Sequence, residues 1–191
     1  MAQFNFAEKS EIEELHIEPT DVMTGDRNKS RYLLYQLKLS MAWAKQIDII
    51  VSFLMESGVR MLLSDLKAAL QRGVRIRILT GNYLGITQPS ALYLLKKELG
   101  DKVELRFYSD KGRSFHPKSY IFHYDSMSEI YIGSSNISRS ALTSGIEWNY
   151  RFNNNQDRQN FNLFYATFED LFKNHSYVIN DAELKAYSKN W

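Results

Sequence analysis

Apolar and polar positions alternate with two different periods along the first half of this chain. Between residues 28 and 107 these periods predict helix, strand, helix, strand, helix and strand, in that order. Residues 47–53 form a nearly continuous apolar run, which is typical of a strand buried on both faces. Strands that alternate with helices favour a sheet covered by helices on both faces. We therefore expect an α/β fold with a mixed, largely parallel β-sheet.

The second half of the chain predicts shorter elements before one long helix. Residues 116–124 and 130–133 are typical of a hairpin, residues 138–144 of a short helix, and residues 146–152 of a last strand. The helix that follows has the strongest amphipathic pattern in the chain. Its apolar stripe consists of Phe161, Phe164, Tyr165, Phe168, Leu171 and Phe172. We expect this stripe to be core, and a partner surface is the alternative.

The length of 191 residues suits a single domain with one core. We divide it into an N-terminal arm (1–27), a core (28–175) and a C-terminal tail (176–191). The arm is acidic, and we expect an extended segment with one short strand at most. His16 lies in the arm, and we expect a solvated or packed side chain rather than a functional one. The tail is predicted to be a short helix.

Two arginines alternate with apolar residues in the predicted strand 74–79. Arg75 and Arg77 share one face of this strand, opposite Ile76 and Ile78. One interpretation is a solvated face on which the arginines form ion pairs. The other is a pair of cations that faces phosphate groups.

The composition narrows the classes of function. Apolar residues make up 44% of the chain, as in a globular protein, and there is no cysteine for a disulfide or a thiolate metal site. We see neither a signal peptide nor an apolar run long enough to span a membrane, so we expect a cytoplasmic protein without membrane contact. The net charge is only +2, so nucleic-acid binding requires a local basic patch. Lys111 and Arg113 are candidates, and an ordinary exposed loop is the alternative.

Two short polar patterns stand at the ends of predicted strands. His116-Pro117-Lys118 begins the first strand of the hairpin, and Gly133-Ser134-Ser135-Asn136 ends the second. Residues two apart in a strand point to the same face, so His116 and Lys118 share a face, and Ser134 and Asn136 can share one. If the strands are neighbours, an imidazole, an ammonium, a hydroxyl and an amide converge at one end of the sheet. That set can attack a phosphodiester and hold its charged oxygens.

These patterns resemble the motif of the phospholipase D superfamily, H-x-K followed by an acid and then G-S-x-N. Glu147, eleven residues after Asn136, stands where the family often has a glutamate. The resemblance implies a phospholipase D-like α-β-α sandwich and a catalytic set of His116, Lys118, Ser134, Asn136 and Glu147. The segment of residues 133–149 also resembles phospholipase D-like segments of restriction-type nucleases and of proteins with bacterial helicase modules. We expect the neighbouring Arg139 to contact nucleic acid.

One position departs from the family pattern. Five residues after Lys118, where the family usually has aspartate, this chain has His123. Asp125 lies two residues further on and has the same strand parity. It could face the same way, one pleat step away. We expect the role of this acid to be structural more than chemical.

A single H-x-K pattern supplies half of the required chemistry. A neutral imidazole can attack phosphorus, but the leaving oxygen needs a proton from a second, protonated histidine. None of His16, His123 and His175 is followed by lysine two residues later. We therefore expect a two-fold homodimer with its axis between two copies of His116, as the resemblance also implies. In that site Glu147 would orient an imidazole.

The sequence thus predicts a phosphodiesterase that acts on DNA, as a module of a helicase or restriction-type protein. Lys118 and Asn136 would stabilise the charged oxygens, so we expect no metal and no cofactor. Two alternatives remain open. One is a nucleic-acid-binding or dimerisation module that does not cut. The other is hydrolysis of a lipid or a small diester.

Overall fold

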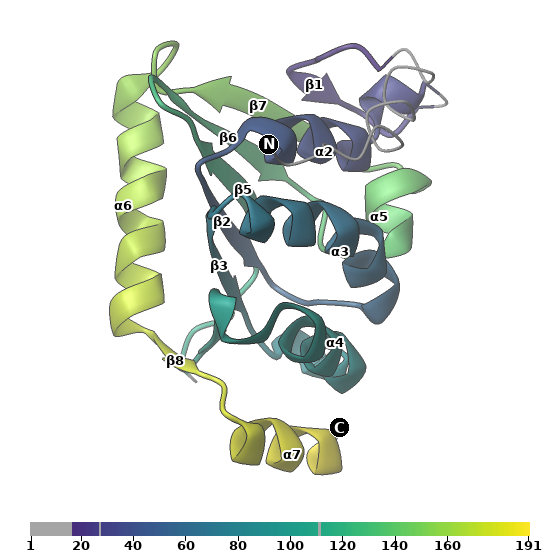
Figure 1. Ribbon diagram of the computed structural model, residues 1–191, viewed down its shortest axis with the longest axis vertical. Helices are drawn as coiled ribbons and strands as arrows, with labels where there is room; N and C mark the ends of the chain where they lie inside the picture. The colour runs from purple at the N-terminus through teal and green to yellow at the C-terminus, as the bar shows by residue number, and fades with distance from the viewer. Residues whose placement is uncertain (1–16, 27, 111) are drawn as a thin grey trace.

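Eight strands form one sheet in the computed structural model, which describes residues 17–26, 28–110 and 112–191. Helices lie on both sides of this sheet (Figure 1). The strands are β1 (Val22–Met23), β2 (Gln46–Val51), β3 (Arg75–Thr80), β4 (Val103–Tyr108), β5 (Lys118–His123), β6 (Ser128–Gly133), β7 (Asn149–Asn153) and β8 (Ser176–Val178). The helices are α2 (Leu33–Trp43), α3 (Glu56–Gln71), α4 (Pro89–Leu99), α5 (Arg139–Thr143), α6 (Arg158–Asn174) and α7 (Asp181–Asn190), with short 3-10 helices η1 (Lys29–Arg31), η2 (Tyr83–Gly85) and η3 (Gly100–Lys102). The predicted α/β class is confirmed.

The strands run across the sheet in the order β1-β7-β6-β5-β2-β3-β4-β8. Among the strands of the described ranges, β2–β3 and β3–β4 pair in parallel, and the other five pairs are antiparallel. The sheet is mixed, as predicted, but its parallel part is confined to the three adjacent strands β2, β3 and β4, which corrects the expectation of a largely parallel sheet. Strands that alternate with helices predict parallel pairing only where a helix connects two neighbouring strands. The hairpin β5–β6 and the edge strands are connected differently and pair antiparallel.

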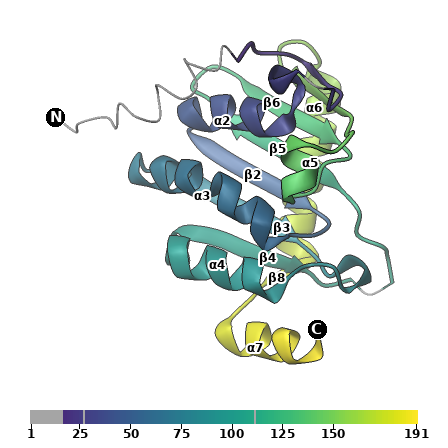
Figure 2. The ribbon, with the colours of Figure 1, turned by 90° about the vertical axis from the view of Figure 1, so that its right-hand side faces the viewer.

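Helices α2, α3 and α4 cover one face of the sheet, and α6 covers the other (Figures 1 and 2). Strand β2 is central and contributes to both layers. Ile47, Ile49 and Val51 pack in the core under α2, α3 and α4, while Ile50 packs in the cluster beneath α6. All four side chains are 5% exposed or less, so the prediction of a strand buried on both faces is confirmed. Each such burial stabilises the fold by roughly 1.5–3 kcal/mol.

Helix α6 begins after Asp157, whose side chain accepts a hydrogen bond from the backbone N–H of Asn160. Phe161, Phe168 and Phe172 are buried against the sheet, as the stripe predicted. Phe164 is 45% exposed, which corrects its assignment to the core. The apolar stripe of α6 is wider than the part of the helix that contacts the sheet, so Phe164, at one side of the stripe, remains exposed to solvent.

The two ends of the described chain complete the sheet. Strand β1 pairs with β7 and is the short strand predicted for the arm, while His16 lies outside the described residues. In the tail, β8 pairs with β4, and Tyr187 of α7 donates a hydrogen bond to the Thr87 carbonyl oxygen at 2.6 Å. The division into arm, core and tail stays a prediction. No helix in the described ranges is long and apolar enough to cross a membrane.

A buried ion cluster joins β2, β3 and α6. Arg77 is 2% exposed, and its Nε and Nη2 donate to the two carboxylate oxygens of Asp48 at 2.6 and 2.8 Å. Its Nη2 also lies 2.6 Å from Glu169 Oε1. Arg77 therefore forms the ion pairs of the first interpretation, but the predictions of a solvated face and of a phosphate contact are wrong for it, because α6 covers this part of the face. Arg75 does form the expected exposed ion pair, with Glu104 at 2.6 Å.

The cluster ties stability to pH. Burial on its own would raise the pKa of Asp48, but hydrogen bonds from Arg77 and His123 outweigh it and hold the pKa below its ordinary value. A carboxyl with a lowered pKa in the folded state stabilises the fold above its unfolded pKa. That contribution is lost as the pH falls through the folded pKa.

Replacing Arg77 with methionine should lower the free energy of unfolding by about 3–5 kcal/mol, because two carboxylates lose their buried partner. Arg75→Met is the matched control on the same strand, and its exposed pair should cost about 1 kcal/mol at most. Urea unfolding at pH 7, followed by circular dichroism, measures both. Equal losses in the two variants would contradict the assignment.

Candidate active site

His116 and Lys118 meet at the start of β5. The Lys118 Nζ lies 2.9 Å from Nδ1 and 3.1 Å from Nε2 of His116, and it donates to the His116 carbonyl oxygen at 2.8 Å. Lys118 is 8% exposed, whereas His116 is exposed. The strand was expected to start at His116, but it starts at Lys118. Pro117 has no N–H to donate to a neighbouring strand, so ladder pairing begins after it.

The pKa values of both His116 and Lys118 lie below their ordinary values. Partial desolvation of the His116 ring by its neighbours lowers its pKa, and the positive charge of Lys118 lowers it further. Burial also lowers the pKa of Lys118, while the negative charge of Glu147 acts in the opposite direction. The imidazole is therefore neutral over a wider pH range than an ordinary histidine, and a neutral imidazole is the nucleophilic form.

The Gly133–Asn136 turn packs tightly against β5 and β7. A Cβ on Gly133 would lie 2.2 Å from the Trp148 carbonyl oxygen, so this close approach requires glycine. The Ser135 hydroxyl accepts a hydrogen bond from Asn149 Nδ2 at 2.9 Å, and its carbonyl accepts one from the Tyr120 hydroxyl at 3.0 Å. Ser135 thus anchors the turn and leaves the residues on either side of it to face the site.

Asn136 is buried against the end of β2. Its Oδ1 accepts hydrogen bonds from the Ser52 hydroxyl at 2.8 Å and from the Phe53 backbone N–H at 3.2 Å. In the pairing of β2 with β5, Val51 lies opposite Lys118. Ser52 and Phe53, which Asn136 contacts, directly follow Val51. The two halves of the motif therefore meet at one end of the sheet, as predicted.

The backbone after Asn136 is held separately. Ile137 forms a parallel bridge with Leu54, and its carbonyl oxygen accepts a hydrogen bond from the Met55 N–H at 2.9 Å. A Cβ on Gly58 would lie 2.5 Å from the carbonyl carbon of Ile137, so α3 approaches this backbone directly. These contacts position the motif turn without using the Asn136 side chain.

Ser134 and Glu147 interact on the exposed side of the turn. The Ser134 hydroxyl donates to Glu147 Oε2 and accepts a hydrogen bond from the Trp148 N–H at 3.1 Å. Because β6 ends at Gly133, strand alternation does not extend to the motif: Ser134 is exposed, while Asn136 is buried. The charge of Glu147 acts on Lys118. Its role in orienting an imidazole stays a prediction.

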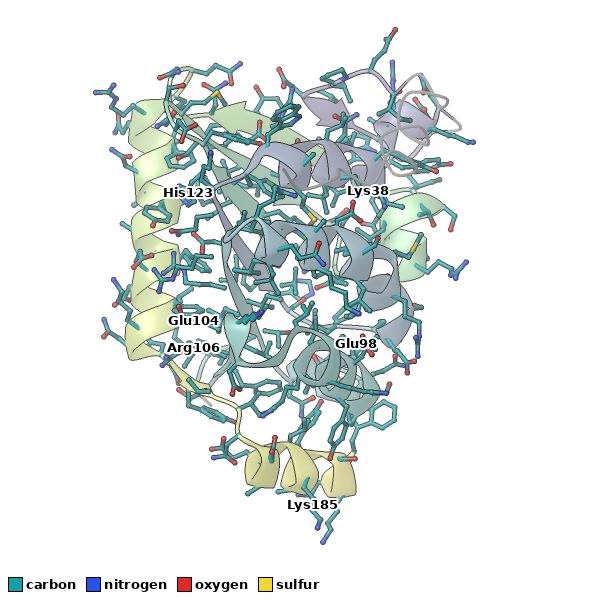
Figure 3. All side chains as sticks on the ribbon, viewed as in Figure 1. Lys38, Glu98, Glu104, Arg106, His123 and Lys185 are labelled. Atoms are coloured by element: carbon teal, nitrogen blue, oxygen red, sulfur yellow. The ribbon has the colours of Figure 1, made fainter. Side chains whose placement is uncertain are left out.

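The position of the usual aspartate lies at the far end of β5. His123 Nε2 lies 3.0 Å from Asp48 Oδ2, its Nδ1 lies 2.9 Å from Ser128 Oγ, and its ring packs edge-on against Tyr165 of α6. Figure 3 labels His123, on the opposite end of the strand from Lys118. Asp125 does not replace the missing acid, because its side chain is 85% exposed in the turn and lies 3.6 Å from Lys45. The carboxylate at this place comes instead from Asp48 on β2.

The three basic candidates differ in what the structure describes. Lys111 lies outside the described residues. Arg113 is exposed in the loop before β5, and Arg139 is exposed at the start of α5. Contact with nucleic acid stays a prediction for all three. Within residues 17–26, 28–110 and 112–191, no group of three or more histidine, aspartate or glutamate side chains is arranged to hold a metal ion.

Sequence reasoning missed two contributors to the site. Ser52 holds the amide of Asn136, and Asn149 holds Ser135. A polar residue near the end of the apolar run of residues 47–53 was a signal, because ligands in α/β sheets gather at the carboxyl ends of parallel strands. Asn149 carries no such signal, since its contact forms only when β6 and β7 pair.

Comparison with solved structures places this fold among phospholipase D-like proteins. Nuc, a phospholipase D family member from Salmonella typhimurium, superposes with a TM-score of 0.63 at 22% identity, over 85% of this chain and 100% of that one. NucT from Helicobacter pylori gives a TM-score of 0.58 at 15% identity, over 75% of this chain and 89% of that one. TrmBL2, an archaeal chromatin protein with a novel mode of DNA binding, gives 0.52 at 21% identity, over 91% and 61%. At these identities the likeness concerns the fold alone.

Comparison at the level of sequence identifies the family. No curated protein matches the chain. A family model described as "cardiolipin synthase, PLD-like domain" matches residues 37–174, which is well over half of the chain and includes both motifs. The chain therefore belongs to the phospholipase D superfamily.

Proposed function

We propose that this chain is a phosphodiester hydrolase that acts on DNA through a covalent phosphohistidine, in a site completed by a second copy. The observation that carries the proposal is the Lys118 ammonium 2.9 Å from His116 Nδ1. It favours a neutral imidazole and places a cation beside the reacting phosphorus. Family membership supports phosphodiester chemistry in general.

The reaction would proceed in two displacements. A ring nitrogen of His116 attacks phosphorus, an N–P bond forms, and the P–O bond to the leaving alkoxide breaks. The imidazolium of the partner copy donates a proton to this alkoxide. The partner's imidazole is then neutral and takes a proton from a water molecule. The resulting hydroxide attacks phosphorus, and the N–P bond to His116 breaks. Both histidines return to their starting protonation states, and the products are an alcohol and a phosphate monoester.

Charged oxygens would be held by donors that the fold already orients. Lys118 supplies an ammonium, and Asn136 supplies an amide whose oxygen is occupied by Ser52 and Phe53. Preorganised donors at the place where charge develops are often the largest single contribution to catalysis. In the proposed mechanism these donors stabilise the charge that a divalent cation stabilises in other phosphodiesterases. No step of the proposed mechanism uses a metal ion.

DNA is proposed as the substrate on three grounds. The single motif and modest length resemble the nucleases of the superfamily rather than its lipid-cleaving members. TrmBL2, which shares the fold, is a DNA-binding chromatin protein. Arg113 and Arg139 are exposed and available to phosphates. The proposal includes a cytoplasmic location and a helicase or restriction module as partner.

An exposed apolar strip beside the site supports dimerisation. Ile146, Trp148 and Tyr150 are 85%, 72% and 54% exposed. The strip starts next to the bonded pair of Ser134 and Glu147. Large exposed aromatic residues are typical of interface anchors. A second copy docked here would lie beside the motif, as a two-histidine site requires.

A non-cutting module that binds nucleic acid or dimerises is the second candidate function. The observation that favours it is His123 in the position of the usual aspartate. Both candidates place DNA at the same strand ends, and they differ in whether products form.

His116→Asn should abolish DNA cleavage, with a loss of at least about 10³-fold, because the nucleophile is gone. His175→Asn, at the end of α6, is the matched control and should cleave normally. The measurement is nicking of plasmid and single-stranded DNA in the presence of chelator. A mobility shift without products in the unmodified protein would favour the binding module instead.

Lys118→Met should raise the pKa of His116 toward the ordinary histidine value of about 6.5, because the nearby positive charge is removed. NMR titration of the imidazole Cε1–H signal measures this. Lys185, exposed on α7 (Figure 3), provides the control Lys185→Met, which should leave the titration unchanged. A pKa that stays constant or falls in Lys118→Met would refute the electrostatic coupling.

Trp148→Glu should convert a dimer into monomers and lower cleavage together with it, since a charge at an interface anchor must be desolvated. Trp43, 74% exposed at the end of α2 and at the other end of β2 from the site, provides the control Trp43→Glu. Analytical ultracentrifugation gives the mass, and nicking gives the activity. An active monomer would overturn the two-copy site.

A further inference from the structure

The orientation of the Asn136 amide is determined by a donor that cannot act as an acceptor. The Phe53 backbone N–H lies 3.2 Å from the atom assigned as Oδ1. An N–H can only donate, so the amide oxygen must face Phe53. The Ser52 hydroxyl donates to the same oxygen at 2.8 Å. The Nδ2 group therefore points away from the end of β2.

The Nδ2 group is left without a partner inside the fold. Asn136 is 4% exposed, yet among residues 17–26, 28–110 and 112–191 no hydrogen-bond acceptor is found for its Nδ2. Nδ2 is not among the fully buried polar atoms that lack a partner in the described residues, so this end of the amide reaches solvent. A donor that has no internal acceptor and reaches solvent, at the strand end that carries Lys118, is suited to an external acceptor such as a phosphoryl oxygen.

We propose that Ser52 is a positioning residue for the reaction: its hydroxyl holds the amide of Asn136 so that Nδ2 faces the phosphate. This rests on the proposed phosphodiester chemistry. With the amide oxygen occupied, the site presents only donors from Asn136 and Lys118. This pair of donors favours the non-bridging oxygens of a phosphodiester anion over a ligand that would need an acceptor at this place.

The role of Ser52 can be separated from the support of the turn. Ser52 is fully buried, and its hydroxyl donates to Asn136. The backbone after Asn136 is held independently by the Leu54–Ile137 bridge and the Met55–Ile137 hydrogen bond of 2.9 Å. Removing the hydroxyl should leave the turn in place and release only the side-chain amide to rotate.

Strand β5 offers a matched control. Ser119 is also buried next to the site, opposite Ile50 of β2, but its hydroxyl has no hydrogen-bond partner among the described residues. Ser119→Ala removes the same kind of atom, a buried serine hydroxyl, from the neighbouring strand. It tests whether loss of any buried hydroxyl at this strand end has the effect predicted for Ser52.

Ser52→Ala should lower kcat for cleavage about tenfold with KM nearly unchanged, because one hydrogen bond that orients a transition-state donor is lost. Ser52→Thr should restore most of kcat, and Ser119→Ala should retain it. In an Asn136→Ala background, Ser52→Ala should have no further effect, since Ser52 acts through Asn136. Asn136→Asp, which puts a negative oxygen in the place of Nδ2, should be more damaging than Asn136→Ala.

Two results would overturn the proposal: equal kcat values for Ser52→Ala and Ser119→Ala, or an unreduced effect of Ser52→Ala without Asn136. The proposed chemistry fails separately, when His116→Asn still cleaves. In that case the side-chain amide signals of Asn136 in ¹⁵N NMR decide the question. Ser52→Ala should shift them and Ser119→Ala should not, and unchanged signals in Ser52→Ala would refute the positioning role without any measurement of activity.

Discussion

The antiparallel pairing of β2 with β5 is the contact on which the site depends. It sets Val51 opposite Lys118, so the carboxyl end of one strand lies beside the amino end of the other. The apolar run of β2 is buried on both faces, which makes this register costly to change, because a one-residue slip would turn each side chain to the opposite layer. The motif turn then joins the same corner through hydrogen bonds from Ser52 and Phe53 to Asn136.

The buried cluster around Arg77 shows how the fold accommodates an unusual residue in the family motif. His123 takes the place of the expected aspartate, and its partner is the carboxylate of Asp48, which also binds Arg77. Arg77 in turn reaches Glu169 of α6, so the cluster connects the sheet to the helix that covers it. Because this cluster and Lys118 occupy opposite ends of β5, its effect is on the stability of the sheet rather than on the reacting groups.

The candidate site combines an exposed imidazole with buried donors. His116 is exposed and precedes the strand, whereas Lys118 and Asn136 are buried and belong to elements held on several sides. Such a division suits the proposed reaction, in which the imidazole would bond to phosphorus while the donors hold its oxygens in place. It also leaves the imidazole accessible to a second copy of the chain. The apolar strip that starts at Ile146 continues from the same corner.

Much of this protein was determined by its sequence. The apolar periods predicted the central helices and strands, and the spacing of two motifs predicted that His116, Lys118 and Asn136 meet at strand ends, because strand alternation and hairpin pairing are local rules. The fate of Arg77 and the contribution of Ser52 were decided only by the tertiary structure. Arg77 has the same local pattern as the exposed Arg75, and it is buried because α6, far away in the sequence, packs over it. Ser52 contacts Asn136 because the motif turn, 84 residues away in the sequence, brings an amide to its hydroxyl.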